Sequence, residues 1–149
     1  MKSFQFSLAR MRSYKEQVLE KEKTTLRHLQ AEKTRIEMEI ENLESHRKNR
    51  EEEFKNSKNG LMASDLMLYK FHSENTRLQL NNLYEELKRA EQRIDAQIKV
   101  VVGASQEVSG LDKLEEKQLE EYRYLEAKEM QEEILEMVAK KSTEEEINS

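Results

Sequence analysis

The side chains that most often carry catalysis or bind metal ions are few in this chain. Its three histidines, His28, His46 and His72, lie far apart in the sequence, and cysteine is absent. His28 has a carboxylate at Glu32, and this i,i+4 spacing would suit two metal ligands on one helix face. Because a third and a fourth ligand are not evident, we interpret the pair as a solvated surface contact.

Other signatures of catalysis are missing from the sequence. There is no glycine-rich phosphate-binding loop, and no serine has a base partner nearby in the sequence. The coiled coil that we predict below would enclose no substrate pocket. We therefore expect a protein that is not an enzyme, with no catalytic residue, no cofactor and no metal. The alternative, a hydrolase or metal enzyme, would require metal bound to the purified protein.

The composition predicts long helices instead of a compact globular core. Of the 149 residues, 38% are charged and 36% hydrophobic, which is too polar to fill an ordinary core. Proline is absent and glycine occurs three times, so almost nothing in the chain interrupts a helix.

Charge and hydropathy exclude two further classes of protein. A formal net charge of -5 argues against a dedicated nucleic-acid binder, because neutralising phosphates needs a basic surface. Arg10 and Arg12 interrupt the first apolar run, so we expect no secretion signal there. The apolar patch at Val100–Val102 is far too short to span a bilayer. We expect a soluble, cytoplasmic chain with no direct membrane insertion.

Apolar residues recur at alternating spacings of three and four in two long segments, as they do along the seam of a coiled coil. The first stripe comprises Leu8, Met11, Val18 or Leu19, Leu26, Leu29, Ile36, Ile40, Leu43 and Phe54. Charged residues fill its vacant seam positions, at Lys15, Glu22, Lys33, Arg47 and Arg50. The second stripe comprises Leu80, Leu83, Leu87, Ala90, Ile94, Gln97 and Val101.

A turn separates the two segments. The stretch Asn56–Gly60 is rich in turn-forming residues, and Ser64 or Asp65 can cap the helix that follows. We predict an all-α fold, in which two long helices form an antiparallel coiled-coil hairpin with a longer second arm. This single domain, residues 1–149, would comprise a helix over about 4–57, a turn at about 58–64, a helix over about 65–141 with a kink allowed at 103–110, and a frayed tail at 142–149.

The register of the hairpin follows from the position of the turn. With a reversal near Gly60, residue i lies beside roughly residue 120 minus i, within about one helical turn. The basic start of the chain then lies beside the acidic stretch from Asp112 to Glu136, which favours this pairing. Some residues of the second arm would project beyond the first arm without a partner in the monomer, namely Tyr122, Tyr124, Leu125, Met130, Ile134 and Met137.

Two regions carry more apolar surface than a hairpin seam needs. The side chains of Leu61–Phe71 point in nearly every direction around a helix, so they either close the tip against Phe54 or form a docking site. The projecting end would be covered either by a second copy of the chain or by a different protein. The residues alone leave both alternatives open.

An ordered set of short motifs along the whole chain resembles the flagellar FliJ family. These motifs are a phenylalanine-rich start, a G-L-x-A-x-x-L turn, and L-x-K-L-x-x-K-x-x-x-E-Y followed by E-x-x-x-x-Q. They comprise Phe4, Phe6 and Leu8; Gly60, Leu61, Ala63 and Leu66; and Leu111, Lys113, Leu114, Lys117, Glu121, Tyr122, Glu126 and Gln131.

The resemblance implies a component of the bacterial flagellar type III protein export apparatus, similar to the central stalk of rotary ATPases. It would promote ring assembly and activity of the hexameric export ATPase, bind the cytoplasmic domain of the export gate, and escort substrate-specific export chaperones. Its location would be the cytoplasm, peripheral at the cytoplasmic face of the cell membrane.

The resemblance also suggests which residues contact each partner. The ATPase ring would contact Leu114, Leu119, Tyr122, Leu125 and Met130. The export gate would contact Leu68, Tyr69 and Phe71. The alternatives are a structural homodimeric coiled coil, or the stalk of an injectisome or of another rotary ATPase.

Overall fold

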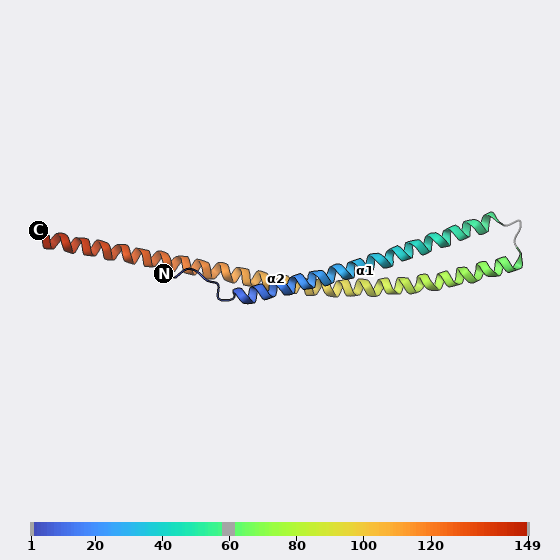
Figure 1. Ribbon diagram of the computed structural model, residues 1–149, viewed down its shortest axis with the longest axis horizontal. Coiled ribbons are helices and arrows are strands. Elements are labelled where there is room, and N and C mark those ends of the chain that lie inside the picture. The colour runs from blue at the N-terminus through green and yellow to red at the C-terminus, as the bar shows by residue number, and fades with distance from the viewer. Residues whose placement is uncertain (1, 58–61, 149) are drawn as a thin grey trace. The chain divides into compact units, whose positions relative to one another are not determined.

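The computed structural model describes residues 2–57 and 62–148, and it contains two helices (Figure 1). Helix α1 spans Ala9–Asn56 and helix α2 spans Ala63–Asn148. The described residues contain no strand. The fold is an all-α antiparallel hairpin whose second helix is the longer, which confirms the predicted fold class. The centre of the predicted turn, including Gly60 and Leu61, lies outside the described residues.

The helix ends explain where the regular structure begins and stops. Residues 2–6 precede α1 and are not helical, so α1 begins later than predicted. The carboxylate of Asp65 accepts a hydrogen bond from the backbone N–H of Met62 at 3.1 Å, which satisfies a free donor at the start of α2. Helix α2 continues to Asn148, beyond the predicted end at about residue 141.

The chain divides into two compact units. Unit 1 consists of Met1–Leu19 and Gly103–Ser149, and unit 2 consists of Glu20–Val102. Each unit therefore contains one stretch of α1 and one stretch of α2.

Unit 2 contains the apolar core. Ile36 and Ile40 of α1 pack with Leu80 and Ala90 of α2, and three half-buried leucines, Leu43, Leu83 and Leu87, surround this cluster. These residues alternate in spacings of three and four on both helices, as the predicted stripes require. A polar contact continues the seam, because the side-chain amide of Gln97 donates to the Glu22 carboxylate at 2.6 Å and to its carbonyl oxygen at 3.0 Å.

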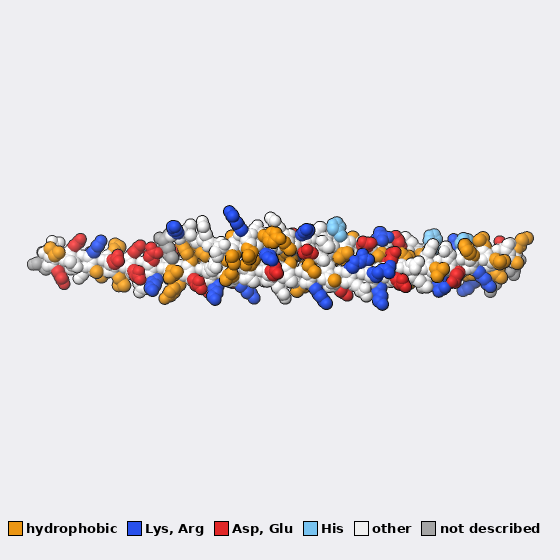
Figure 2. All heavy atoms as spheres, turned by 90° about the horizontal axis from the view of Figure 1, so that it is seen from below, with side chains coloured by type: hydrophobic (Ala, Val, Ile, Leu, Met, Phe, Trp, Pro, Cys, Tyr) orange, Lys and Arg blue, Asp and Glu red, His pale blue; other side chains and the backbone are white. Residues whose placement is uncertain are grey.

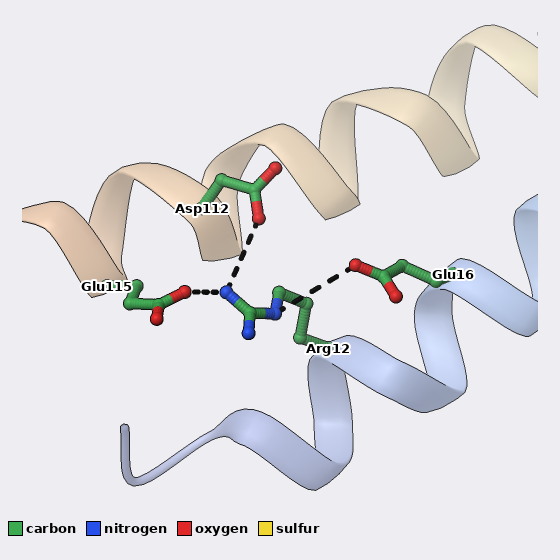
Figure 3. A network of polar contacts seen from close by, with 4 residues as sticks. All are labelled: Arg12, Glu16, Asp112 and Glu115. Carbon is green, nitrogen blue, oxygen red and sulfur yellow. Dashed lines mark ion pairs between the residues drawn. The ribbon is translucent and has the colours of Figure 1, made fainter. Parts of the chain in front are cut away.

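Ion pairs join α1 to α2 in unit 1 (Figure 3). The guanidinium of Arg12 on α1 forms ion pairs with Glu115 and Asp112 of α2, the latter at 3.7 Å. Lys15 forms an ion pair with Glu107 at 2.8 Å, and the Glu107 carboxylate raises the pKa of the Lys15 ammonium through this hydrogen bond and its charge. The predicted attraction between the basic start and the acidic part of α2 is therefore present in this unit.

The prediction that Met11 lies in the seam is wrong. Met11 is 49% exposed, whereas Arg12 is half-buried and faces α2. Counting back from Glu22 in alternating steps of three and four, through Leu19 and Lys15, leads to Arg12 and not to Met11. A rule that accepts only apolar residues in the seam selects the wrong side chain here.

Helix α2 is continuous through Gly103 and Gly110. A Cβ atom added to either glycine would meet no other atom within 4 Å, so neither glycine is required by close packing. Alanine at either position is expected to raise the free energy of unfolding by about 1 kcal/mol, because alanine loses less conformational freedom in a helix. Chemical denaturation followed by circular dichroism measures this change, and a loss of stability in either variant would contradict it.

Candidate partner-binding surfaces

Tyr122 has a partner within its own chain, contrary to the prediction that it projects freely. Its ring lies 5.5 Å from that of Phe4, and its hydroxyl donates to the carbonyl oxygen of Lys2 at 2.5 Å. Burial, followed by the nearby carboxylate of Glu126, raises the pKa of the Tyr122 hydroxyl.

The error arises from the register. In unit 1, Arg12 pairs with Asp112 and Ser7 contacts Gln118, so paired residue numbers sum to about 124 or 125 instead of 120. The difference of about one helical turn lies within the uncertainty of the predicted register. It is enough to bring Tyr122 opposite the first residues of the chain.

The residues preceding α1 form a strap against α2, comprising residues 2–8. Phe6 is buried, and the Arg12 guanidinium lies over its ring at 5.4 Å from the ring centroid. The Ser7 hydroxyl is hydrogen-bonded to the side chain of Gln118 at 3.4 Å. These contacts cover α2 as far as Tyr122.

The five residues predicted to contact an ATPase ring therefore fall into two groups. Leu114, Leu119 and Tyr122 are half-buried within unit 1. Leu125 and Met130 are exposed, at 51% and 58%. Of these five, only Leu125 and Met130 can contact another protein while the two stretches of unit 1 stay paired.

Beyond Tyr122 the apolar residues of α2 move to another face of the helix. The intramolecular seam repeats in threes and fours up to Tyr122, and the same spacing next reaches Leu125, Glu129 and Glu132. At about 100° per residue, Met130 and Ile134 lie roughly 100° and 140° around the helix from Glu129. The exposed residues that follow this new direction form the distal stripe, which comprises Tyr124, Met130, Ile134, Leu135, Met137 and Val138.

Glutamates flank the distal stripe. Glu126, Glu129, Glu132, Glu133 and Glu136 occupy the other side of the same helical segment. Figure 2 shows orange apolar and red acidic side chains together at this end of α2, and in Figure 1 no other described residues of unit 1 run beside its last turns. This segment is an amphipathic helix with one apolar face and one acidic face.

A second apolar surface lies at the start of α2, in unit 2. Tyr69, one of the three predicted gate contacts, stacks on Phe54 with ring centroids 4.1 Å apart, so the tip is closed by this pair. The other two, Leu68 and Phe71, are exposed together with Met67. We call Met67, Leu68 and Phe71 the tip patch. The contact that closes the tip is therefore present at Tyr69, and a docking site at the tip patch stays a prediction.

The pair with the spacing of two metal ligands, His28 and Glu32, lies on α1. His28 is exposed, and Glu32 forms an ion pair with Arg35 at 3.6 Å. Within residues 2–57 and 62–148, no group of three or more histidine, aspartate or glutamate side chains is placed to hold a metal ion. Over the same ranges, neither helix has a stretch that is apolar and long enough to cross a membrane.

His46 and His72 do come together, although the sequence separates them by a whole arm of the hairpin. Both line one groove between α1 and α2 in unit 2. No local motif indicates this pair, because the two histidines are far apart in sequence, but the predicted register places His46 within a turn of His72.

Comparisons of the chain with protein-family models, with curated proteins and with solved structures gave no match.

Proposed function

We propose that the chain is a non-enzymatic stalk and adaptor of the bacterial flagellar type III export apparatus, in the manner of the FliJ family. The distal stripe would bind the hexameric export ATPase and promote its assembly and activity. The tip patch would bind the cytoplasmic domain of the export gate, which would place the protein at the cytoplasmic face of the membrane. Escort of substrate-specific export chaperones belongs to the same proposal.

The observation that carries this proposal is the rotated apolar face at the end of α2. A helix that only completed the intramolecular hairpin would keep its apolar residues on the seam. Here Tyr124 is 69% exposed and Ile134 is 58% exposed on a face that α1 does not use. Such a face favours contact with another protein, since contiguous exposed apolar side chains are unusual on a protein without a partner.

The charge of this segment supports a partner that differs from the chain itself. Residues 124–148 contain eight glutamates and three lysines. In a homodimer through the distal stripe, the acidic faces of two copies would flank the same interface and repel one another. An apolar sleeve or groove with a basic rim avoids this repulsion, and it also gains from charge complementarity.

Mixing the purified chain with the flagellar export ATPase from the same cell tests the proposal directly. We expect more hexameric rings by electron microscopy and faster ATP turnover. If neither changes and light scattering shows a stable dimer of the chain alone, the homodimeric coiled coil is the better explanation. If an injectisome ATPase responds and the flagellar one does not, the stalk function holds but in the other secretion system.

The tip patch gives a separate prediction. Alanine in place of Phe71, which is 67% exposed, is expected to weaken binding to the export gate by about 1–3 kcal/mol, because exposed aromatic residues often dominate interfaces. Its effect on unfolding should stay within about 0.5 kcal/mol. Alanine in place of Tyr69 is the comparison, since it removes the stack on Phe54 and should lower stability. Calorimetry with the isolated gate domain measures the binding, and wild-type affinity of the Phe71 variant would exclude this contact.

A further inference from the structure

A polar groove of about 300 Å³ lies between the two helices in the part of unit 2 next to the tip. His46, Arg47 and Arg50 line it from α1, and His72, Asn75 and Thr76 line it from α2. Its volume is at the lower end of the range for small-ligand sites. Nearly every one of these side chains can donate a hydrogen bond.

Arg47 and Arg50 differ from the other charged residues on the α1 side of the seam. Lys15 and Lys33 each form an ion pair with a glutamate of α2, and Glu22 accepts a hydrogen bond from Gln97. Arg47 and Arg50 line the groove with histidine, asparagine and threonine, and Arg50 also lines an adjacent pocket with Glu53 and Asp65. Among the described residues, neither arginine forms an ion pair or a hydrogen bond.

Two neighbouring carboxylates have hydrogen-bond partners that do not line the groove. Glu44, one turn before Arg47, accepts a hydrogen bond from the Tyr84 hydroxyl and raises the pKa of that tyrosine. Glu74 on α2 accepts two hydrogen bonds from Arg77, which lowers the pKa of Glu74. Arg77 therefore neutralises Glu74, whereas Glu44 keeps its negative charge, and the nearby Arg47 acts in the opposite direction on the pKa of Tyr84.

Thr76 supplies a second and independent observation. It is 8% exposed and is the buried polar residue of the described chain. Thr24, Thr25, Thr34 and Thr143 each donate to the backbone carbonyl oxygen four residues earlier, at 2.9–3.2 Å. The Thr76 hydroxyl makes no hydrogen bond within the described residues, and none of their fully enclosed side-chain polar atoms lacks a partner. Its oxygen therefore reaches the groove, where a ligand can bind it.

We propose that this groove binds a phosphate group. Two guanidinium groups can each hold phosphate oxygens through paired, charge-assisted hydrogen bonds. The Asn75 amide, the Thr76 hydroxyl and the two imidazoles add donors at the sides of the groove. The bound group is either free phosphate or the phosphate of an anionic lipid headgroup, since both present the same oxygens. The inference is independent of the proposed partners, because it concerns the isolated chain.

Titration of the full chain with inorganic phosphate tests the site, with sodium chloride added to keep the ionic strength constant. We expect saturable changes in the NMR signals of the Asn75 and Thr76 amides and of the two histidine rings. The double variant Arg47→Gln, Arg50→Gln should weaken phosphate binding by about tenfold or more, since each lost charge-assisted hydrogen bond matters at that scale. Lys48→Gln is the matched control, because Lys48 is adjacent in sequence and does not line the groove.

Thr76→Val provides a test that does not alter charge. Valine keeps the shape of threonine without its hydroxyl, so the helices stay paired while phosphate binding weakens several-fold. Co-sedimentation with vesicles then separates the two sources of phosphate. Retention on phosphatidylglycerol but not phosphatidylcholine, lost in the double arginine variant, identifies a headgroup site. Saturable binding of free phosphate without vesicle retention identifies a soluble ligand. If chloride alone reproduces the spectral changes, or neither source binds, the proposal is wrong.

Discussion

Replacing Met130 and Ile134 together with alanine is expected to abolish stimulation of the export ATPase. Both side chains lie in the distal stripe and are more than half exposed, so shortening them should change the free energy of unfolding of the free chain by no more than about 0.5 kcal/mol each. Truncating an apolar anchor of an interface commonly costs about 1–2 kcal/mol, so the two together should cost about 2–4 kcal/mol. We therefore expect binding to weaken by roughly 30-fold to 1000-fold, measured by ATP turnover and by calorimetry.

The control for this experiment lies on the same free segment. Ile147 is 77% exposed but lies outside the distal stripe, so alanine there should leave ATPase stimulation unchanged. Helical content should also be unchanged in both variants, because alanine favours helix. If the Ile147 variant lost as much stimulation as the double variant, general hydrophobicity and not the stripe would be responsible.

Alanine in place of Ile36 is expected to lower the free energy of unfolding by about 2–4 kcal/mol, because it leaves a cavity in the core. Ile36 is 2% exposed and packs in the cluster with Ile40, Leu80 and Ala90. Since a slender two-helix core has few such residues, one truncation removes a large share of its apolar contact.

Denaturant unfolding followed by circular dichroism measures this loss. Met38 on the outer side of α1 is 59% exposed and serves as the matched control, for which we expect a change within about 0.5 kcal/mol. A small loss at Ile36, similar to that at Met38, would show that the charged seam and not the apolar cluster holds the helices together.

The helices and their core could be predicted from sequence because spacing alone determines which side of a helix is apolar. Ile36, Ile40, Leu80, Ala90 and Ile94 were all in the predicted stripes, and all are buried. The prediction failed at Met11, where hydropathy favours the methionine but geometry places Arg12 in the seam. A charged residue with a partner across the seam can take such a position, and a single-helix pattern does not include that partner.

The candidate surfaces were harder to predict because they depend on register to within one turn. A shift of about four residues decides whether Tyr122 is free or covered by the strap. The change of face between Tyr122 and Met130 was visible in the sequence as a break in the alternating spacing. Position beyond the first arm does not by itself determine which face is apolar, because that also depends on direction around the helix. The residues that line the polar groove come from both helices, so no motif within one segment of the sequence indicates it.

The ion pairs of unit 1 also determine the length of the unpaired end of α2. Lys15 opposite Glu107 and Arg12 opposite Asp112 are satisfied in one alignment, and sliding α1 by seven residues would place Lys15 near Val100 or Leu114 instead. Such a slip would shorten or lengthen the free end of α2 by about 10 Å. A seam made only of leucine would tolerate that slip, whereas this one does not. The charged contacts thus determine how far the distal stripe extends beyond the N-terminal end of α1.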